Sequence, residues 1–256
     1  MTNERRVLVH PDGDALIAAV AARSLTKAVD LLDEFDVVNV VLTGGTAGGD
    51  VQRAVAASGM RNTIDWSRVH FWWGDERFLP KNHPDRNEVQ AREALLDHLQ
   101  VPEANIHPFP ASDEIEDIDR AAAAYAEVLQ QFAPDGARVP RFDITFLGVG
   151  PDGHIASLFP DREGIREEEK TVVAVRNSPK PPPERLTLTL PAINSSNRIW
   201  MVLSGPEKAS ALGLALAGAS PAEVPVAGAQ GRKRTVFFVD RAAAAKVPQN
   251  LIASTY

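Results

Sequence analysis

Short apolar runs alternate with longer amphipathic stretches along most of the chain. The runs are rich in branched and aromatic residues and end in glycine or charged residues, which is typical of buried strands. They occupy residues 7–10, 37–42, 69–73, 142–147, 171–175, 198–203 and 235–239. Leucine and threonine alternate over 186–190, which predicts a half-buried strand, and 106–109 is expected to form a short edge strand.

The amphipathic stretches between these runs predict helices. Apolar positions recur at helical spacing from Leu16 to Leu32, after Asp12 or Asp14 as the N-terminal cap. Further helices are expected at about 50–57, 87–99, 113–132 and 206–217. Because strands alternate with helices, the pattern predicts an α/β fold with a doubly wound, mostly parallel sheet. We expect a single domain over residues 1–256, since this length fits one large domain and no internal repeat is present.

Composition argues against several classes of protein. The formal net charge of −7 argues against nucleic-acid binding, although a few cations in one cleft can still bind an anionic substrate. The chain has no cysteine, so it forms no disulfide and has no thiol nucleophile, and we expect no metal site. No segment has the length of a membrane span or the apolar core of a signal peptide. We therefore expect a cytoplasmic protein that does not bind membranes.

The segment 146–160, FLGVGPDGHIASLFP, is the strongest candidate for chemistry. A buried strand ends in glycine, and Pro-Asp-Gly then supplies residues that favour a turn. His154 is therefore expected just past the carboxyl end of a strand, in the first turn of a short helix that ends before Pro160. Ligands of open α/β sheets bind at that edge. A histidine without a role is the alternative, but the flanking glycines let a ligand approach the backbone and favour a functional residue.

Three other groups follow predicted strands or begin helices. Residues 43–49, TGGTAGG, suit phosphate binding by backbone N–H groups, with a plain tight turn as an equal alternative. The charged residues 75–77 end a strand and are expected to face a cleft, with a solvated turn as the alternative. Lys208 begins a helix, where a cation opposes the helix dipole, and such local conflicts are more common at functional sites. The proline-rich segment 178–185 is expected to be a rigid, extended internal connector, with a ligand for a peptide-binding domain as the less favoured alternative.

These motifs together resemble the 6-phosphogluconolactonase family, within the larger group that contains glucosamine-6-phosphate deaminases. The matching segments are LTGGT at 42–46, WGDER at 73–77, HPDRN at 83–87, LGVGPDGHIASLFP at 147–160, ERLTLT at 184–189 and SGPEKA at 204–209. Arg86 departs from the family pattern, in which a small residue is common before the asparagine. The resemblance implies a Rossmann-like sheet with helices on both faces, of the NagB/RpiA/CoA transferase-like type.

The resemblance also implies an activity and a set of roles. The reaction is hydrolysis of 6-phospho-D-glucono-1,5-lactone to 6-phosphogluconate in the oxidative pentose phosphate pathway, without a cofactor. His154 is implied as the general base, Arg77 is the candidate for stabilising the oxyanion, and Asp152 either orients His154 or only caps the turn. The candidates for binding this sugar-phosphate lactone are Gly44, Gly45, Thr46, Asp75, Arg185 and Lys208, of which all but Asp75 are assigned to the phosphate. We expect a monomer, with an oligomer left open.

Two alternative functions remain. The related deaminases share the Gly-x-Gly-x-Asp-Gly-His core but continue with Ile-Gly-Phe-Asn-Glu-Pro, whereas residues 155–160 are IASLFP and lack the glutamate. Ring opening and isomerisation rely on that acidic residue, so its absence favours the lactonase. A sensor that binds a sugar phosphate without turnover is the second alternative. Such regulators usually carry a helix-turn-helix segment, for which the residues before Val7 are expected to leave no room.

Overall fold

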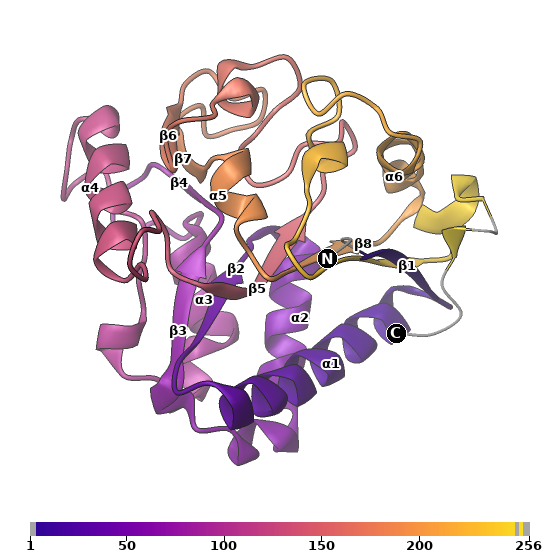
Figure 1. Ribbon diagram of the computed structural model, residues 1–256, viewed down its shortest axis with the longest axis horizontal. Helices are drawn as coiled ribbons and strands as arrows, with labels where there is room; N and C mark the ends of the chain where they lie inside the picture. The colour runs from indigo at the N-terminus through magenta and orange to yellow at the C-terminus, as the bar shows by residue number, and fades with distance from the viewer. Residues whose placement is uncertain (1–3, 249–250, 253–256) are drawn as a thin grey trace.

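The computed structural model describes residues 4–248, 251 and 252, and its centre is a six-stranded parallel sheet (Figure 1). The strand order is β1-β9-β8-β5-β2-β3. These strands are β1 Glu4–His10, β2 Val38–Leu42, β3 Val69–Trp73, β5 Phe142–Gly148, β8 Arg198–Leu203 and β9 Arg234–Asp240. Every residue of β2 and the first six of β5 are buried, as expected for parallel strands covered on both faces.

Helices cover both faces of this sheet, so the predicted fold class is confirmed. Figure 1 shows α1 (Gly13–Glu34) and α2 (Gly45–Ala57) beneath it, and α5 (Leu190–Asn194) and α6 (Ala209–Leu216) above it. Asp12 is the N-cap of α1, since its side chain accepts a 2.8 Å hydrogen bond from the Ala15 N–H. Among the described residues, no helix is both long enough and apolar enough to cross a membrane.

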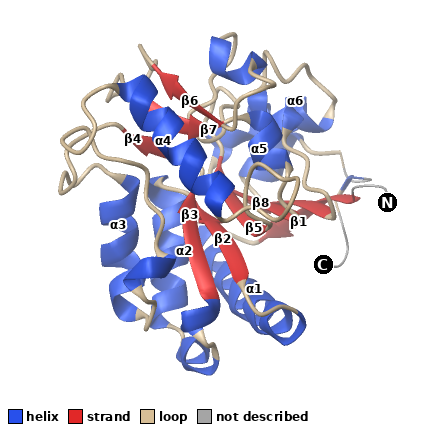
Figure 2. Ribbon diagram, turned by 60° about the vertical axis from the view of Figure 1, so that its left-hand side comes forward, coloured by secondary structure: helices blue, strands red, loops and turns tan. Residues whose placement is uncertain are grey.

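A second, three-stranded antiparallel sheet was not expected from the sequence. It pairs β4 (Asp75–Arg77) with β7 (Arg185–Leu188) and β7 with β6 (Val172–Val175), and α4 (Ile118–Gln131) lies against it (Figure 2). The strand predicted at 186–190 is β7, but the expectation that one face of it is solvated was wrong, because all four residues of β7 are buried. The hydroxyl of Thr187 is satisfied internally: it donates to the Leu188 carbonyl and accepts from the Ser157 N–H.

Several predicted boundaries differ from those of the structure. The helix predicted at 50–57 begins at Gly45, and the one predicted from 113 begins at Ile118, after Asp117 as its N-cap. The helix predicted at 87–99 is α3 (Asn87–Ala94) followed by a short 3-10 turn, and 106–109 forms only an isolated bridge to β3. The 3-10 helices are Gly59–Thr63, Trp66–Arg68, Leu96–His98, Glu103–Asn105, Glu163–Arg166, Pro206–Lys208, Pro225–Gly228 and Ala243–Lys246.

A small cavity of about 60 Å³ lies between α1, α2 and the central sheet. Its walls are mostly apolar and include Leu25, Val55, Phe71 and Phe146. Thr43, the last residue before the glycine loop, also lines it. The start of α2 therefore rests on a small void as well as on packed side chains.

Candidate active site

A cleft of about 880 Å³ opens at the carboxyl ends of β2 and β5. These strands are neighbours in the sheet, but the chain leaves them in opposite directions, to β3 on one side and to β8 on the other. Ligand sites of open α/β sheets form at such switch points. The hydroxyl of Thr43 accepts a 3.2 Å hydrogen bond from the Gly148 N–H and joins the two strand ends.

The glycine loop forms one wall of the cleft. Gly44, Gly45 and Thr46, the three residues predicted there, all line it. Gly44 is the N-cap of the 13-residue α2 and has no side chain to occupy the N–H groups of the first turn. Those groups have no partner within the helix and favour an anion. Glycine is needed at 44, because a Cβ there would lie 2.0 Å from Oδ1 of Asn87.

His154 faces the cleft from the loop after β5, held by a carboxylate. Its Nδ1 lies 2.5 Å from Oδ1 of Asp152, and the same oxygen accepts a 3.4 Å hydrogen bond from the His154 N–H. Asp152 therefore makes both of the contacts that the sequence left open. Burial alone would raise the pKa of Asp152, but its hydrogen bond to His154 and the charge of that ring lower the pKa to about 2.

The expectation that His154 begins a helix was wrong. After Gly150 the chain makes a tight turn, with Gly153 at φ +84°, and then forms two isolated bridges, Val149 to Ile155 and Ile155 to Leu158. The Gly150 N–H donates to the His154 carbonyl at 2.9 Å, which closes the loop. Position 150 requires glycine, because a Cβ would lie 2.0 Å from Nδ1 of His154.

Asp75 and Arg77 line the cleft from β4, but Glu76 does not, so the expectation that all three charges face a cleft was wrong. Residues of a strand point alternately to its two faces, which separates Glu76 from its neighbours. Asp75 accepts a 2.6 Å hydrogen bond from the hydroxyl of the buried Ser157. The guanidinium of Arg77 donates to the backbone carbonyl of Asp85.

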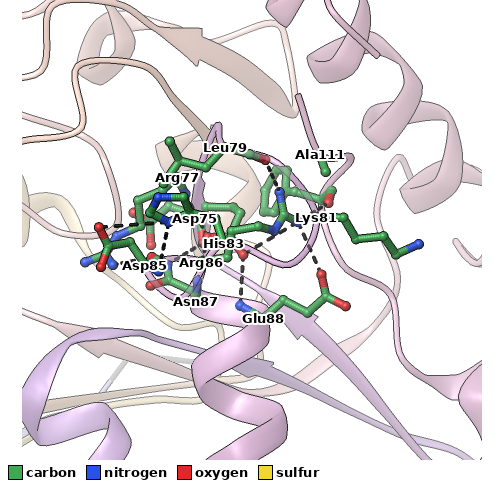
Figure 3. Close-up of polar contacts among 12 residues, drawn as sticks. Asp75, Arg77, Leu79, Lys81, His83, Asp85, Arg86, Asn87, Glu88 and Ala111 are labelled. Atoms are coloured by element: carbon green, nitrogen blue, oxygen red, sulfur yellow. Dashed lines mark hydrogen bonds and ion pairs between the residues drawn. The ribbon is translucent and has the colours of Figure 1, made fainter. Parts of the chain in front are cut away.

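Glu76 lies behind the cleft, in a buried network with Arg86. Its carboxylate accepts hydrogen bonds from the N–H groups of Arg77, Asn87 and Glu88, at 2.7, 2.6 and 2.9 Å. Figure 3 shows Arg86 between Leu79 and Glu88. Burial raises the pKa of Glu76, and Arg86 with the three N–H donors counteracts that effect. Arg86, the departure from the family pattern, is thus a fully buried cation that helps to fix β4 and the start of α3.

The predicted cations Arg185 and Lys208 also reach the cleft. Lys208 follows β8, and its Nζ is 3.9 Å from Oε1 of Glu207. Burial lowers the pKa of Lys208; Glu207 opposes this effect, and repulsion from Lys180 adds to it. Arg185 is largely engaged with its own loop, since Nε and Nη2 donate to backbone carbonyls of residues 180–182.

Several residues that line the cleft were given no role from the sequence, among them Arg53, Asn87 and Lys180. Asn87 stood within the HPDRN motif, and Lys180 stood between prolines in the presumed connector, so both had a sequence signal that received no role. Nothing in the sequence distinguished Arg53 from a surface helix residue. Among the described residues, no three His, Asp or Glu side chains are placed to hold a metal ion together.

Comparison with known proteins identifies the class. The chain belongs to the family described as glucosamine-6-phosphate isomerases/6-phosphogluconolactonase, whose model matches residues 11–238. A curated 6-phosphogluconolactonase of Streptomyces coelicolor is 47% identical over 98% of both chains. A solved 6-phosphogluconolactonase from Thermotoga maritima is 30% identical, with a TM-score of 0.80 over 93% of this chain and all of that one. A solved monomeric glucosamine-6-phosphate deaminase shares the fold, with 19% identity and a TM-score of 0.78 over 94% of this chain and 99% of that one.

Proposed function

We propose that this chain hydrolyses 6-phospho-D-glucono-1,5-lactone to 6-phosphogluconate, as a step of the oxidative pentose phosphate pathway. The observation that carries the proposal is the placement of His154. Its Nδ1 is bound to Asp152, and Nε2 has no hydrogen-bond partner among the described residues. Cationic side chains line the same cleft, which suits an anionic lactone.

The mechanism follows from the tautomer that Asp152 favours. A carboxylate accepts the Nδ1 proton, so the lone pair of the neutral ring lies on Nε2. Nε2 takes a proton from water as the water oxygen bonds to the lactone C1. The C1–ring oxygen bond of the tetrahedral intermediate then breaks, and the imidazolium returns the proton to the departing oxygen. One histidine serves both steps, and the product is the open-chain acid.

Charged groups on either side of His154 supply the remaining parts. Arg77 is our candidate for the oxyanion that develops on the C1 carbonyl oxygen, a role in which a preorganised cation is valuable. The N-terminus of α2 with Gly44, Gly45 and Thr46 is the candidate for the phosphate, together with Arg185 and Lys208. Asp75, held by Ser157, is left to accept a hydrogen bond from a sugar hydroxyl.

The rival deaminase reaction lacks its acidic residue in this site. The deaminase pattern carries its glutamate directly before the proline, and Phe159 stands at that position here, with its ring centre 4.7 Å from that of His154. Ammonia release from glucosamine 6-phosphate is therefore expected to be absent. We further propose that the chain acts in the cytoplasm and as a monomer, because one chain supplies the glycine loop, His154 and the cations of the cleft.

The test compares 6-phosphogluconolactone with unphosphorylated δ-gluconolactone, after subtraction of spontaneous hydrolysis at slightly acidic pH. Donors arranged for a phosphate go unpaired with the smaller lactone, and sites of this kind discriminate by up to about 10⁴-fold in kcat/KM. We expect a large preference for the phosphorylated lactone. Equal kcat/KM values would contradict the phosphate assignment, and no hydrolysis of either lactone would contradict the proposed function.

A further inference from the structure

The proline-rich segment before β7 brings a lysine to the cleft. Lys180 stands between Pro179 and Pro181, is exposed, and lines the cleft together with His154 and Lys208. Prolines have no N–H to donate, so such a segment cannot be fixed by the usual backbone ladder. It is fixed in other ways: the Ser178 N–H donates to the Pro183 carbonyl at 2.9 Å, and the Lys180 N–H donates to the Ser178 hydroxyl at 3.2 Å.

The guanidinium of Arg185 completes the support of this segment. Its Nη2 donates to the carbonyls of Lys180 and Pro181 at 3.2 and 2.8 Å, and its Nε donates to that of Pro182 at 3.2 Å. Arg185 is only 7% exposed and begins β7, so its side chain has a rigid base. Three hydrogen bonds from one planar group to three successive carbonyls fix the backbone at Lys180.

Lys180 carries a charge that the described residues do not neutralise. No carboxylate among them forms an ion pair with its ammonium group, and the other lysine of the cleft is near enough for repulsion from Lys180 to lower its pKa. Oε1 of Glu207 lies 3.9 Å from Nζ of Lys208, so the one ion pair that either lysine forms among the described residues involves Lys208 and not Lys180. Like charges held at one site by rigid loops are unfavourable until an anion binds between them, and an anion of charge −2 gains most.

We propose that Lys180 binds the phosphate dianion of the substrate together with Lys208, and that Arg185 is the positioning residue that holds Lys180 at the cleft. The proposal rests on the proposed function and adds a recognition residue to it. The stiffness of the proline-rich segment favours binding, because a lysine on a mobile loop would lose more conformational entropy when the phosphate binds. The segment predicted to be a connector is thus part of the site.

The experiment compares Lys180→Ala with Lys233→Ala, which removes an exposed lysine from a loop that does not line the cleft. For 6-phosphogluconolactone, Lys180→Ala is expected to lower kcat/KM about 10–100-fold, mainly through KM, because a phosphate contact is made in both ground and transition states. Hydrolysis of δ-gluconolactone is expected to stay unchanged. Lys233→Ala is expected to change neither.

Calorimetry with the products separates a failure of this proposal from a failure of the proposed function. Lys180→Ala should weaken 6-phosphogluconate binding and leave gluconate binding unchanged, whether or not the parent hydrolyses the lactone. Unchanged affinity for 6-phosphogluconate, or equal losses for the phosphorylated and unphosphorylated ligands, would overturn the proposal.

The positioning role of Arg185 is tested by a double-mutant cycle. Arg185→Gln releases the carbonyls of residues 180–182, so adding Lys180→Ala to it is expected to cost less than Lys180→Ala costs alone. If the fold-loss in kcat/KM of the double variant equals the product of the two single losses, the positioning role is overturned, and Arg185 acts on the ligand independently of Lys180. Circular dichroism shows whether Arg185→Gln is folded, and, if it is not, Arg185→Lys takes its place in the cycle.

Discussion

The position of the His154 imidazole depends on a glycine, Gly150, and on the carboxylate of Asp152. Gly150 leaves the space that the ring occupies, and Asp152 holds Nδ1 from the other side of the turn. The ring of Phe159 lies 4.7 Å from that of His154, centre to centre, and limits its rotation. The proposed base is therefore placed by the chain that immediately flanks it, and its geometry does not need a helix.

Replacing His154 by alanine is expected to lower kcat about 10²–10⁴-fold and to change KM little. The reason is that the side chain acts on a proton and has no part in holding the phosphate. His98→Ala is the matched control, since His98 is exposed and does not line the cleft. Steady-state kinetics on 6-phosphogluconolactone measure both variants, and near-native kcat in His154→Ala would exclude His154 as the base.

At the scale of elements, the starts of α2 and α3 pack tightly against each other. Gly44 at the start of α2 packs against Asn87 at the start of α3, and the Nδ2 group of Asn87 donates to the Asp75 carbonyl of β4 at 2.9 Å. Oδ1 of Asn87 is buried without a hydrogen-bond partner among the described residues. The phosphate candidate and the strand that carries Arg77 are therefore coupled through one amide side chain.

Gly44→Ala is expected to destabilise the fold by about 1–3 kcal/mol, because the added methyl group overlaps Asn87 and forces the two helix starts apart. It should also lower kcat/KM for the phosphorylated lactone, since the first turn of α2 moves. Gly59→Ala is the control: a Cβ there meets nothing within 4 Å, so a stability change within about 0.5 kcal/mol is expected. Urea unfolding of both variants measures the difference, and equal midpoints would contradict the packing argument.

The strands of the central sheet were predictable from the sequence because their apolar runs are rich in branched and aromatic residues and are typical of buried strands. The small sheet was not predictable, because β4 consists of three charged residues that pair with β7, a strand far away in the sequence. The alternation in β7 predicted one solvated face, but Thr187 bonds to nearby backbone groups and is buried. The motifs predicted that His154, Arg77 and Lys208 lie together at the cleft, whereas the orientation of Glu76 away from the cleft could be known only from the fold.

At the scale of the whole molecule, two histidines at the edge strand β3 respond to acid. His70 Nδ1 and His107 Nε2 are 2.9 Å apart, and the ring of His107 stacks on Trp72 with centres 3.9 Å apart. Burial lowers the pKa of both, and burial with the charge of His70 lowers that of His107 to about 4. The folded state therefore binds fewer protons than the unfolded chain, whose histidines have a pKa near 6.5.

Stability from His107 is fully present above about pH 6.5 and is lost as the pH falls towards 4. We expect a loss of about 1–2 kcal/mol between pH 7.5 and pH 5 from this residue. His107→Gln should be less stable at pH 7.5, because the stacking on Trp72 is lost, but its stability should fall less on acidification. Denaturant unfolding at both pH values measures how much the free energy of unfolding changes with pH in the parent and in His107→Gln, and the exposed His98→Gln serves as control. An equal change of unfolding free energy with pH in the parent and in His107→Gln would contradict the assignment of this pH dependence to His107.

The cavity between α1, α2 and the central sheet gives the molecule a weak point under compression. Unfolding eliminates its volume of about 60 Å³, so the unfolded chain occupies less space and hydrostatic pressure favours it. The void borders Thr43, directly before the glycine loop. The candidate phosphate-binding end of the cleft therefore rests on a compressible part of the interior.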